Sequence, residues 1–265
     1  MDIASLIGLV LGIGMMVLGI VTGDEGVAGL GNFVHLTSFV ITFGGSIAGV
    51  IGSNSMPDFI NGLKSFTLVL KAVPTNPANT IKNIIDLSNV ARKEGLLALE
   101  EAANELDDPF MKKGIMLVVD GTDPDLVRGI LETDLMCIEE RHKKVIGFWK
   151  KWGELGPAWG MIGTLIGLIN MLKNLSDVST VGPNMSTALI TTLYGSVIAN
   201  WLCSPIADKL AANSAAEITI KEVTVEGLLS IQAGENPRVI EEKLKSFLAP
   251  KQRDTMSADE GGGEE

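Results

Sequence analysis

Three threonine hydroxyls lie inside long apolar stretches of this chain, where they could contact a cation. Thr164 lies nine residues after the start of one stretch, and Thr191 and Thr192 lie six and seven residues after the start of the next. At 1.5 Å per residue these positions are about 13 and 10 Å deep. In antiparallel helices across a ~30 Å hydrocarbon core the hydroxyls therefore come to similar depths. They suit a hydrated or partly dehydrated alkali cation, which predicts an ion pathway. The alternative is that each bonds a carbonyl of its own helix.

The same apolar stretches contain no Asp, Glu, Lys or Arg. An ionisable residue inside a membrane helix marks a functional site by default, so this chain alone is a poor proton carrier. If the protein moves ions, an acidic residue must come from another chain. Cys137 and Cys203 lack metal-ligand spacing, and no nucleophile or cofactor-binding motif occurs. We therefore expect no catalytic residue, no metal site and no cofactor, only a transported cation (H⁺ or Na⁺). The net charge of -11 argues against nucleic acid as a partner.

Four apolar stretches are long enough to cross a membrane as helices. We place them at about 3–21, 31–52, 155–172 and 185–207. The fold class predicted is all-α, an integral membrane protein with four transmembrane helices and a helical cytoplasmic domain. The expected division is a transmembrane hairpin (1–54), a helical cytoplasmic domain (55–154), transmembrane helices three and four (155–208), a helical tail (209–249) and a disordered acidic end (250–265).

The distribution of Lys and Arg predicts the orientation. Segment 62–154 holds thirteen of the 21 basic residues and the tail from Lys209 holds seven, whereas the turn 22–30 holds none. By the positive-inside rule this multi-pass protein of the cell membrane has both termini in the cytoplasm. Trp149, Trp152 and Trp159 flank the third span on its cytoplasmic side, and Trp201 lies near the cytoplasmic end of the fourth. This placement predicts an interfacial aromatic belt.

Helix signals in the cytoplasmic segments are specific. Asp108-Pro109 and Asp123-Pro124 each resemble an N-cap followed by a first-turn proline, and Gly121 can end the helix between them. From Asp123 one long helix can run into the third span. We expect the fourth span to extend to about Gln232, followed by a short helix that begins at Asn236-Pro237 and ends at Pro250.

Small residues predict close helix packing in the last two spans. Gly156 and Gly160 are four apart, and Gly195 lies on one of two small faces of the fourth span. Such rows let helices approach closely, either within one bundle or against a partner helix. Pro157 and Pro205 mark helix boundaries or kinks near the cytoplasmic ends of these spans.

The run ALITTLYGSVIANWLCSP, Ala188 to Pro205, resembles the signature of flagellar motor stator A subunits, the MotA/PomA family. Thr192, Gly195 and Pro205 fall at the expected positions. GPAWGMIGTLIGL around Pro157 and the run ITFGGS resemble the family's other membrane segments. The resemblance covers essentially the whole chain.

This resemblance implies a homo-oligomeric ring in membrane lipid, of five copies, around helices of a stator B subunit that carries the ion-binding aspartate. Cation flow then drives torque on a rotor switch-complex protein. Pro157 and Pro205 match the prolines tied to coupling. Arg92 and Glu100, with the neighbouring Lys93 and Glu101, match the charges that engage the rotor. Without the resemblance these would be solvated surface charges.

Two positions depart from the family pattern. His35 stands where members often have Asp, and Thr37 where they often have Pro. A role of that Asp at the ion entrance therefore does not transfer. Thr164 matches a position typical of sodium-type stators, which favours Na⁺ over H⁺.

Three other functions compete with the stator. An ExbB/TolQ-like energiser typically has three spans, so the hairpin 3–52 and the charges at Arg92 and Glu100 favour the motor. A transporter would show inverted repeats, broken helices or midplane charges. A passive scaffold would need no hydroxyls at matched depth.

Overall fold

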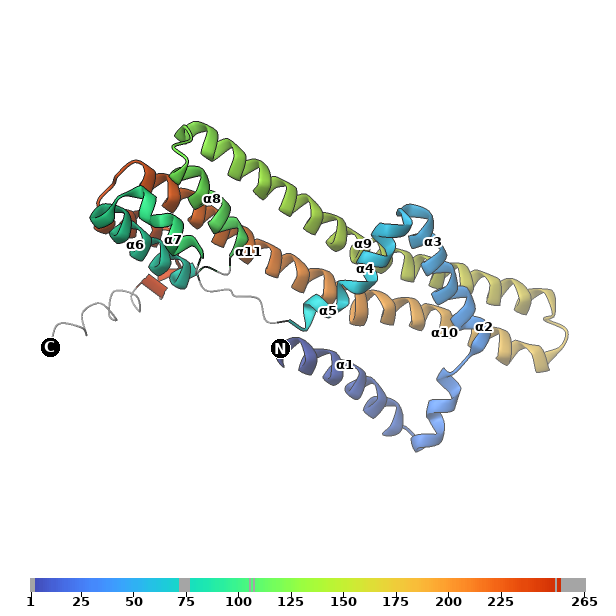
Figure 1. The fold of residues 1–265 in the computed structure, drawn as a ribbon. Helices are drawn as coiled ribbons and strands as arrows, with labels where there is room; N and C mark the ends of the chain where they lie inside the picture. Colours follow the sequence, from blue (N-terminus) through green and yellow to red (C-terminus); the bar gives the residue numbers. More distant parts are fainter. Residues whose placement is uncertain (1–2, 72–76, 105, 107, 251, 254–265) are drawn as a thin grey trace. The chain divides into compact units, whose positions relative to one another are not determined.

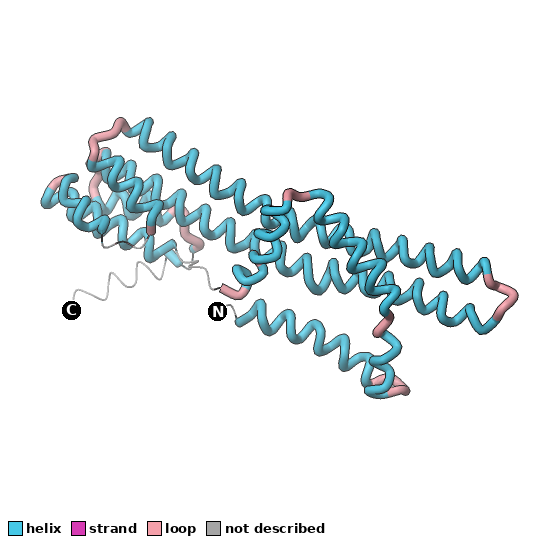
Figure 2. The backbone as a smooth tube through the Cα atoms, turned by 45° about the vertical axis from the view of Figure 1, so that its right-hand side comes forward, coloured by secondary structure: helices cyan, strands magenta, loops and turns pink. Residues whose placement is uncertain are grey.

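The computed structural model describes residues 3–71, 77–104, 106, 108–250, 252 and 253. Every regular element in these residues is helical (Figures 1 and 2). Four helices are long and apolar enough to cross a membrane. The predicted all-α, four-span fold class is thereby confirmed. The chain divides into two compact units, residues 1–72 with 141–212 (the membrane unit) and residues 73–140 with 213–265 (the second unit).

The membrane unit contains all or part of each span. The first span has the bounds predicted from the sequence, and a 50-residue helix carries the third span without a break. The fourth span is likewise continuous and ends at Gln232, as expected. The elements are α1 (Ile3–Val21), η1 (Gly26–Phe33), α2 (Leu36–Phe39), η2 (Val40–Gly44), α3 (Gly45–Ser53), α4 (Met56–Lys64), α5 (Phe66–Val69), α9 (Pro124–Lys173), α10 (Val178–Val197), η4 (Ile198–Cys203) and α11 (Ser204–Gln232).

The second span begins five residues later than the sequence suggested. Residues 26–33 form a separate 3₁₀ segment that starts at Gly26, whose φ of +57° is accessible to glycine at little cost. His35 then caps the new helix, because its Nδ1 accepts the N–H of Ser38 at 3.3 Å. The span Leu36–Ser53 includes the π-helical η2.

Two tryptophans placed in the aromatic belt are core residues instead. Trp149 and Trp152 are 3% and 5% exposed and pack against Phe148. Their indole N–H groups donate to Ser65 Oγ at 2.9 Å and Ser46 Oγ at 3.2 Å. A buried indole needs such an acceptor, so these residues join the third span to the second span and to the α4–α5 junction.

The second unit is a small helical bundle. Its elements are α6 (Pro77–Glu94), η3 (Leu96–Ala98), α7 (Leu99–Asn104), α8 (Pro109–Val119), the first part of α9, the end of α11 and α12 (Pro237–Lys245). As predicted, Asp108, Asp123 and Asn236 accept N–H groups at the starts of α8, α9 and α12. α12 ends at Lys245, so the expectation that Pro250 ends it was wrong. The tail 254–265 lies outside the described residues.

A network of ion pairs between α12, α11 and α9 stabilises the packing of α12 in this bundle. Lys243 Nζ lies 2.6 Å from Glu226 Oε1 and donates to Ser230 Oγ at 3.1 Å, and Arg128 Nη2 lies 3.3 Å from Glu226 Oε2. The hydrogen bond from Lys243 lowers the pKa of the Glu226 carboxyl below its ordinary value, against partial burial, and the charges of Lys243 and Arg128 act in the same direction. The ionised carboxylate therefore stabilises the folded state.

We expect Glu226→Gln to destabilise the protein at pH 7, by about 1 kcal/mol or less because the network is partly exposed. A lowered folded-state pKa gives stability that is full above the pKa of the unfolded chain and is lost as pH falls through the folded-state value. Thermal unfolding in detergent should therefore show the deficit at pH 7 and a smaller one near pH 4. Glu222→Gln removes an exposed carboxylate from the same helix as a control. An unchanged deficit at both pH values would contradict the linkage.

Candidate functional site

A glycine seam holds the third span tightly against the fourth. A Cβ built on Gly156 would lie 3.0 Å from the Gly195 carbonyl oxygen, and one on Gly195 would lie 2.6 Å from the Gly156 carbonyl oxygen. A Cβ on Gly160 would lie 2.9 Å from the Thr191 carbonyl oxygen. Gly163 and Gly167 continue the contact toward the other end of the hairpin. These predicted packing glycines meet inside one chain, where backbone approaches backbone.

We expect Gly195→Ala to destabilise the hairpin by about 1–3 kcal/mol, because the backbone must separate to admit a methyl group. Gly182→Ala on the same helix is the control, since nothing lies within 4 Å of its Cβ position. The melting temperature of the purified protein in detergent would measure both. Equal melting temperatures for the two variants would show that the seam is not close-packed.

The seam places Thr164 and Thr192 side by side. Their Oγ1 atoms lie 2.6 Å apart, and Thr164 Oγ1 also lies 3.0 Å from the Ala188 carbonyl oxygen. Thr164 is half-buried and Thr192 is exposed on the surface of the single chain. Two hydroxyls and a carbonyl oxygen thus gather at one accessible point of the membrane unit, where they can coordinate a cation. Both hydroxyls also lie near carbonyls of their own helices, Gly160 and Ala188, as the alternative interpretation expected.

Thr191 does not join this pair. Its side chain is fully buried, its hydroxyl donates to Thr187 and Ala188 of its own helix, and its Cγ2 would lie 2.4 Å from a Cβ at Gly163. Its carbonyl accepts the hydroxyl of Thr42 at 3.3 Å. Thr191 therefore contributes through helix packing, on a face different from that of Thr192.

A buried hydroxyl row on the second span was missed from the sequence. Ser38, Thr42 and Ser46 are all fully buried. Ser38 donates to the Thr187 carbonyl at 3.3 Å and Thr42 to that of Thr191, so the row fastens the second span to the fourth. Its spacing of four residues was the available signal.

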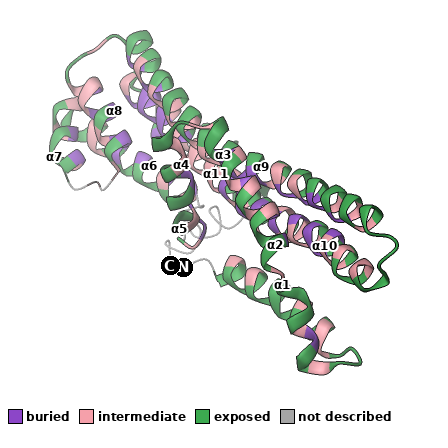
Figure 3. Cartoon of the chain, turned by 90° about the vertical axis from the view of Figure 1, so that its right-hand side faces the viewer, coloured by how far each residue is buried: buried purple, intermediate pink, exposed green. Residues whose placement is uncertain are grey.

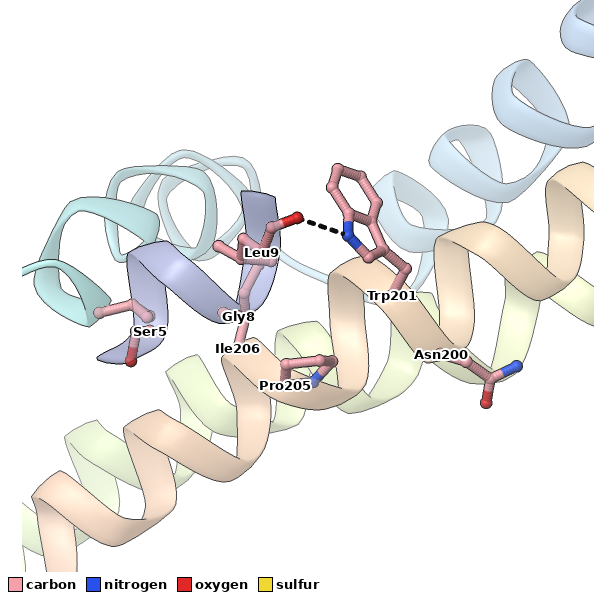
Figure 4. A pocket seen from close by; sticks show the side chains of 8 residues that line it. Ser5, Gly8, Leu9, Asn200, Trp201, Pro205 and Ile206 are labelled. Carbon is pink, nitrogen blue, oxygen red and sulfur yellow. Dashed lines mark hydrogen bonds between the residues drawn. The ribbon is translucent and has the colours of Figure 1, made fainter. Parts of the chain in front are cut away.

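Both prolines lie within continuous helical segments. Pro157 lies inside α9, and its Cα would be 3.0 Å from a Cβ on Gly195. Pro205 is the second residue of α11, which follows the π-helical η4 directly. It lines an apolar cavity of about 320 Å³ against α1, where Trp201 Nε1 donates to the Leu9 carbonyl at 3.0 Å (Figure 4). α1 itself has no buried residue in the chain (Figure 3).

The four charged residues assigned to rotor contact lie on either side of a break. α6 ends at Glu94, and Gly95, with φ of +90°, separates it from η3 and α7. Arg92 and Lys93 are exposed in the last turn of α6, and Glu100 and Glu101 are exposed in the first turn of α7. The two pairs therefore lie on separate helices and not on one continuous helix. The positive pair lies at the C-terminus of α6 and the negative pair at the N-terminus of α7. Each charge therefore interacts favourably with the dipole of its own helix.

The fold and the seam define a multi-pass helical membrane protein whose last two spans form a tight hairpin. The model of the MotA/TolQ/ExbB proton channel family matches residues 102–223. Motility protein A of Borreliella burgdorferi is 39% identical, over 99% of this chain and 100% of its own length. Chemotaxis protein PomA of Vibrio alginolyticus is 41% identical, over 94% of this chain and 96% of its own length. The flagellar MotAB stator complex from Bacillus subtilis contains a chain that superposes with a TM-score of 0.85 at 29% identity, covering 95% of this chain and 98% of that one.

The chain belongs to the motility protein A (MotA/PomA) family, within the wider MotA/TolQ/ExbB proton channel family. The resemblance drawn from the sequence is confirmed.

Proposed function

We propose that this chain is the A subunit of an ion-driven flagellar stator, which converts cation flow across the cell membrane into torque on the flagellar rotor. The observation that carries the proposal is similarity over nearly the whole chain to PomA and to a chain of a MotAB stator complex. The apolar stretches 155–172 and 185–207 agree with this function, because their hydroxyl pair can pass a cation but they contain no Asp or Glu to bind it. An ExbB/TolQ-like energiser accounts less well for four spans.

The partner supported by the similarity is a stator B subunit, since the similar solved structures are MotAB complexes. We propose that this subunit supplies the ion-binding aspartate and that several copies of the present chain, five in the family pattern, surround it. The exposed apolar face of α1 would then contact membrane lipid or a neighbouring copy. The rotor contact through Arg92, Lys93, Glu100 and Glu101 and the cytoplasmic location of both termini belong to the same proposal, as does the five-part division of the sequence.

The Thr164–Thr192 pair favours sodium as the fuel. Two hydroxyl oxygens 2.6 Å apart beside a carbonyl oxygen offer neutral oxygen ligands for an alkali cation. A proton pathway would not need a second hydroxyl there.

The test is the swimming speed of a stator-deleted strain that carries this chain and its cognate B subunit, across sodium concentrations at fixed ionic strength. Speed that rises and saturates with sodium supports both the motor and its fuel. Motility independent of sodium but abolished by a protonophore keeps the motor and makes H⁺ the fuel. An inserted complex that gives no motility rejects the stator function.

We expect Thr164→Val and Thr192→Val each to raise the half-saturating sodium concentration at least fivefold, because each removes one oxygen ligand and keeps the side-chain volume. Thr187→Val is the matched control, since its hydroxyl bonds the Pro183 carbonyl of its own helix at 3.0 Å. The same sodium titration measures all three. Equal half-saturation in all variants would remove the hydroxyl pair from the pathway.

A further inference from the structure

A second polar site lies in the membrane unit, near Asn200, which follows Thr192 by eight residues in the fourth span. A cavity of about 360 Å³ opens between α9 and the η4–α11 stretch. Its polar lining comes from Lys150, Gly153 and Glu154 on α9 and from Asn200, Ser204 and Asp208 on the other helix. Asn200 also lines the apolar cavity against α1, but Figure 4 shows its side chain directed away from α1, toward which Trp201 points.

Pro157 leaves the backbone carbonyl of one cavity-lining residue without its helical donor. In an α-helix the N–H of residue 157 would bond the carbonyl of residue 153. Proline has no N–H, so the Gly153 carbonyl loses its helical donor. Gly153 is one of the cavity-lining residues.

Pro205 does the same on the opposite wall, through the π-helical segment before it. The Ser204 N–H bonds the carbonyl of Ala199 instead of that of Asn200. Pro205, the next residue, has no N–H to offer. Neither residue donates to the Asn200 carbonyl, and Asn200 also lines the cavity. Backbone oxygens freed in this way are tolerated in membrane helices where they line a cavity, and such carbonyls coordinate cations in transporters.

Carboxylates complete an oxygen-rich lining. Asp208 accepts the Ser204 hydroxyl at 3.3 Å, and Glu154 pairs with Lys151 at 3.2 Å. Carbonyl, carboxylate and hydroxyl oxygens are the ligands that hard cations prefer. Lys150 and Lys151 offset part of the negative charge, so a cation would bind weakly and leave readily.

A polar row connects the threonine pair to this cavity. Every fourth residue from Thr192 is polar: Thr192, Ser196, Asn200, Ser204 and Asp208. In a regular α-helix such a row drifts about 40° per step, because four residues exceed a turn of 3.6. The π-helical η4, Ile198–Cys203, has more residues per turn and drifts in the opposite sense. It thereby keeps Asn200, Ser204 and Asp208 on one wall, where all three line the cavity.

We propose that this cavity is the exit site of the transported sodium ion, which passes from the Thr164–Thr192 pair along the polar row to the freed carbonyls of Gly153 and Asn200 and the carboxylates of Glu154 and Asp208. The inference rests on the proposed function, because that function supplies the cation. It gives the two prolines a chemical role, since each exposes one carbonyl ligand.

The test is voltage-driven sodium uptake by vesicles that hold the purified complex of this chain with its cognate B subunit. We expect Glu154→Gln combined with Asp208→Asn to lower uptake at saturating sodium at least fivefold. Because the exit lies after the entry step, the half-saturating external sodium should stay within twofold. Asp208→Glu should keep most of the uptake.

The matched control is Asp125→Asn combined with Glu222→Gln, which removes the same charge from exposed positions of the same two helices. Equal uptake by the double variant and this control would overturn the site, as would a wild-type complex that carries only protons. If the double variant co-purifies with less B subunit, the sodium uptake of Asp208→Asn alone is compared with that of Glu222→Gln, each divided by the amount of assembled complex. Failure of the wild-type chain to restore swimming would reject the proposed stator function while the uptake comparison still decides the site.

Discussion

Replacing Pro157 by leucine is expected to abolish rotation while leaving the complex with the B subunit intact. Leucine returns an N–H to position 157, and this N–H can donate to the Gly153 carbonyl and make α9 a regular helix at this point. The new side chain would face away from the seam, because Pro157 is exposed and the atom of it nearest to Gly195 is its Cα. We therefore expect swimming speed to fall at least tenfold, with unchanged abundance in the membrane and unchanged co-purification with the B subunit.

Ala158→Leu is the matched control for this prediction. It places the same side chain on the next residue of α9, which is also exposed, and does not alter backbone hydrogen bonding. Normal swimming in the control and none in Pro157→Leu would assign the effect to the proline backbone. Normal swimming in both variants would contradict a coupling role for Pro157, and failure of Pro157→Leu to co-purify would indicate a packing role.

The spans were predictable because their cause is local. An uninterrupted apolar length fixes a transmembrane helix, and the first span has the predicted bounds from Ile3 to Val21. The 50-residue α9 was predictable for a similar reason, since Asp123 and Pro124 start it and no strong breaker follows before the span. The N-caps of α8 and α12 also depend on neighbours in sequence.

The arrangement of the threonines was less predictable because it depends on which faces of two helices meet. Thr191 and Thr192 are adjacent in sequence but differ by about 100° around a helix. Small residues line both faces of the fourth span, so the sequence could not say which threonine would meet Thr164. The structure pairs Thr164 with Thr192 and buries Thr191 against Gly163. The π-helical segments η2 and η4 were missed for a different reason: they lie within the long apolar stretches, and no charged residue or proline marks where they begin.

Reversing the charge of Arg92 is expected to reduce torque by at least half without lowering membrane abundance. Arg92 is exposed in the last turn of α6 and makes no ion pair within the described part of the chain. Arg92→Glu therefore costs little stability beyond the less favourable charge at a helix C-terminus, about 0.3–1 kcal/mol. A larger effect on swimming must then come from a contact outside the chain.

Lys82→Glu is the control for Arg92→Glu, because it makes the same kind of reversal at another exposed position of α6. We expect it to leave swimming speed nearly unchanged. An electrostatic rotor contact also predicts recovery of speed when an acidic residue of the rotor switch protein is changed to a basic one in the Arg92→Glu strain. An equal loss of swimming speed in both variants would mean that any charge reversal on this surface has the same effect. Loss of the protein from the membrane would mean that Arg92 is needed for folding. Recovery specific to one rotor position would place that residue opposite the end of α6.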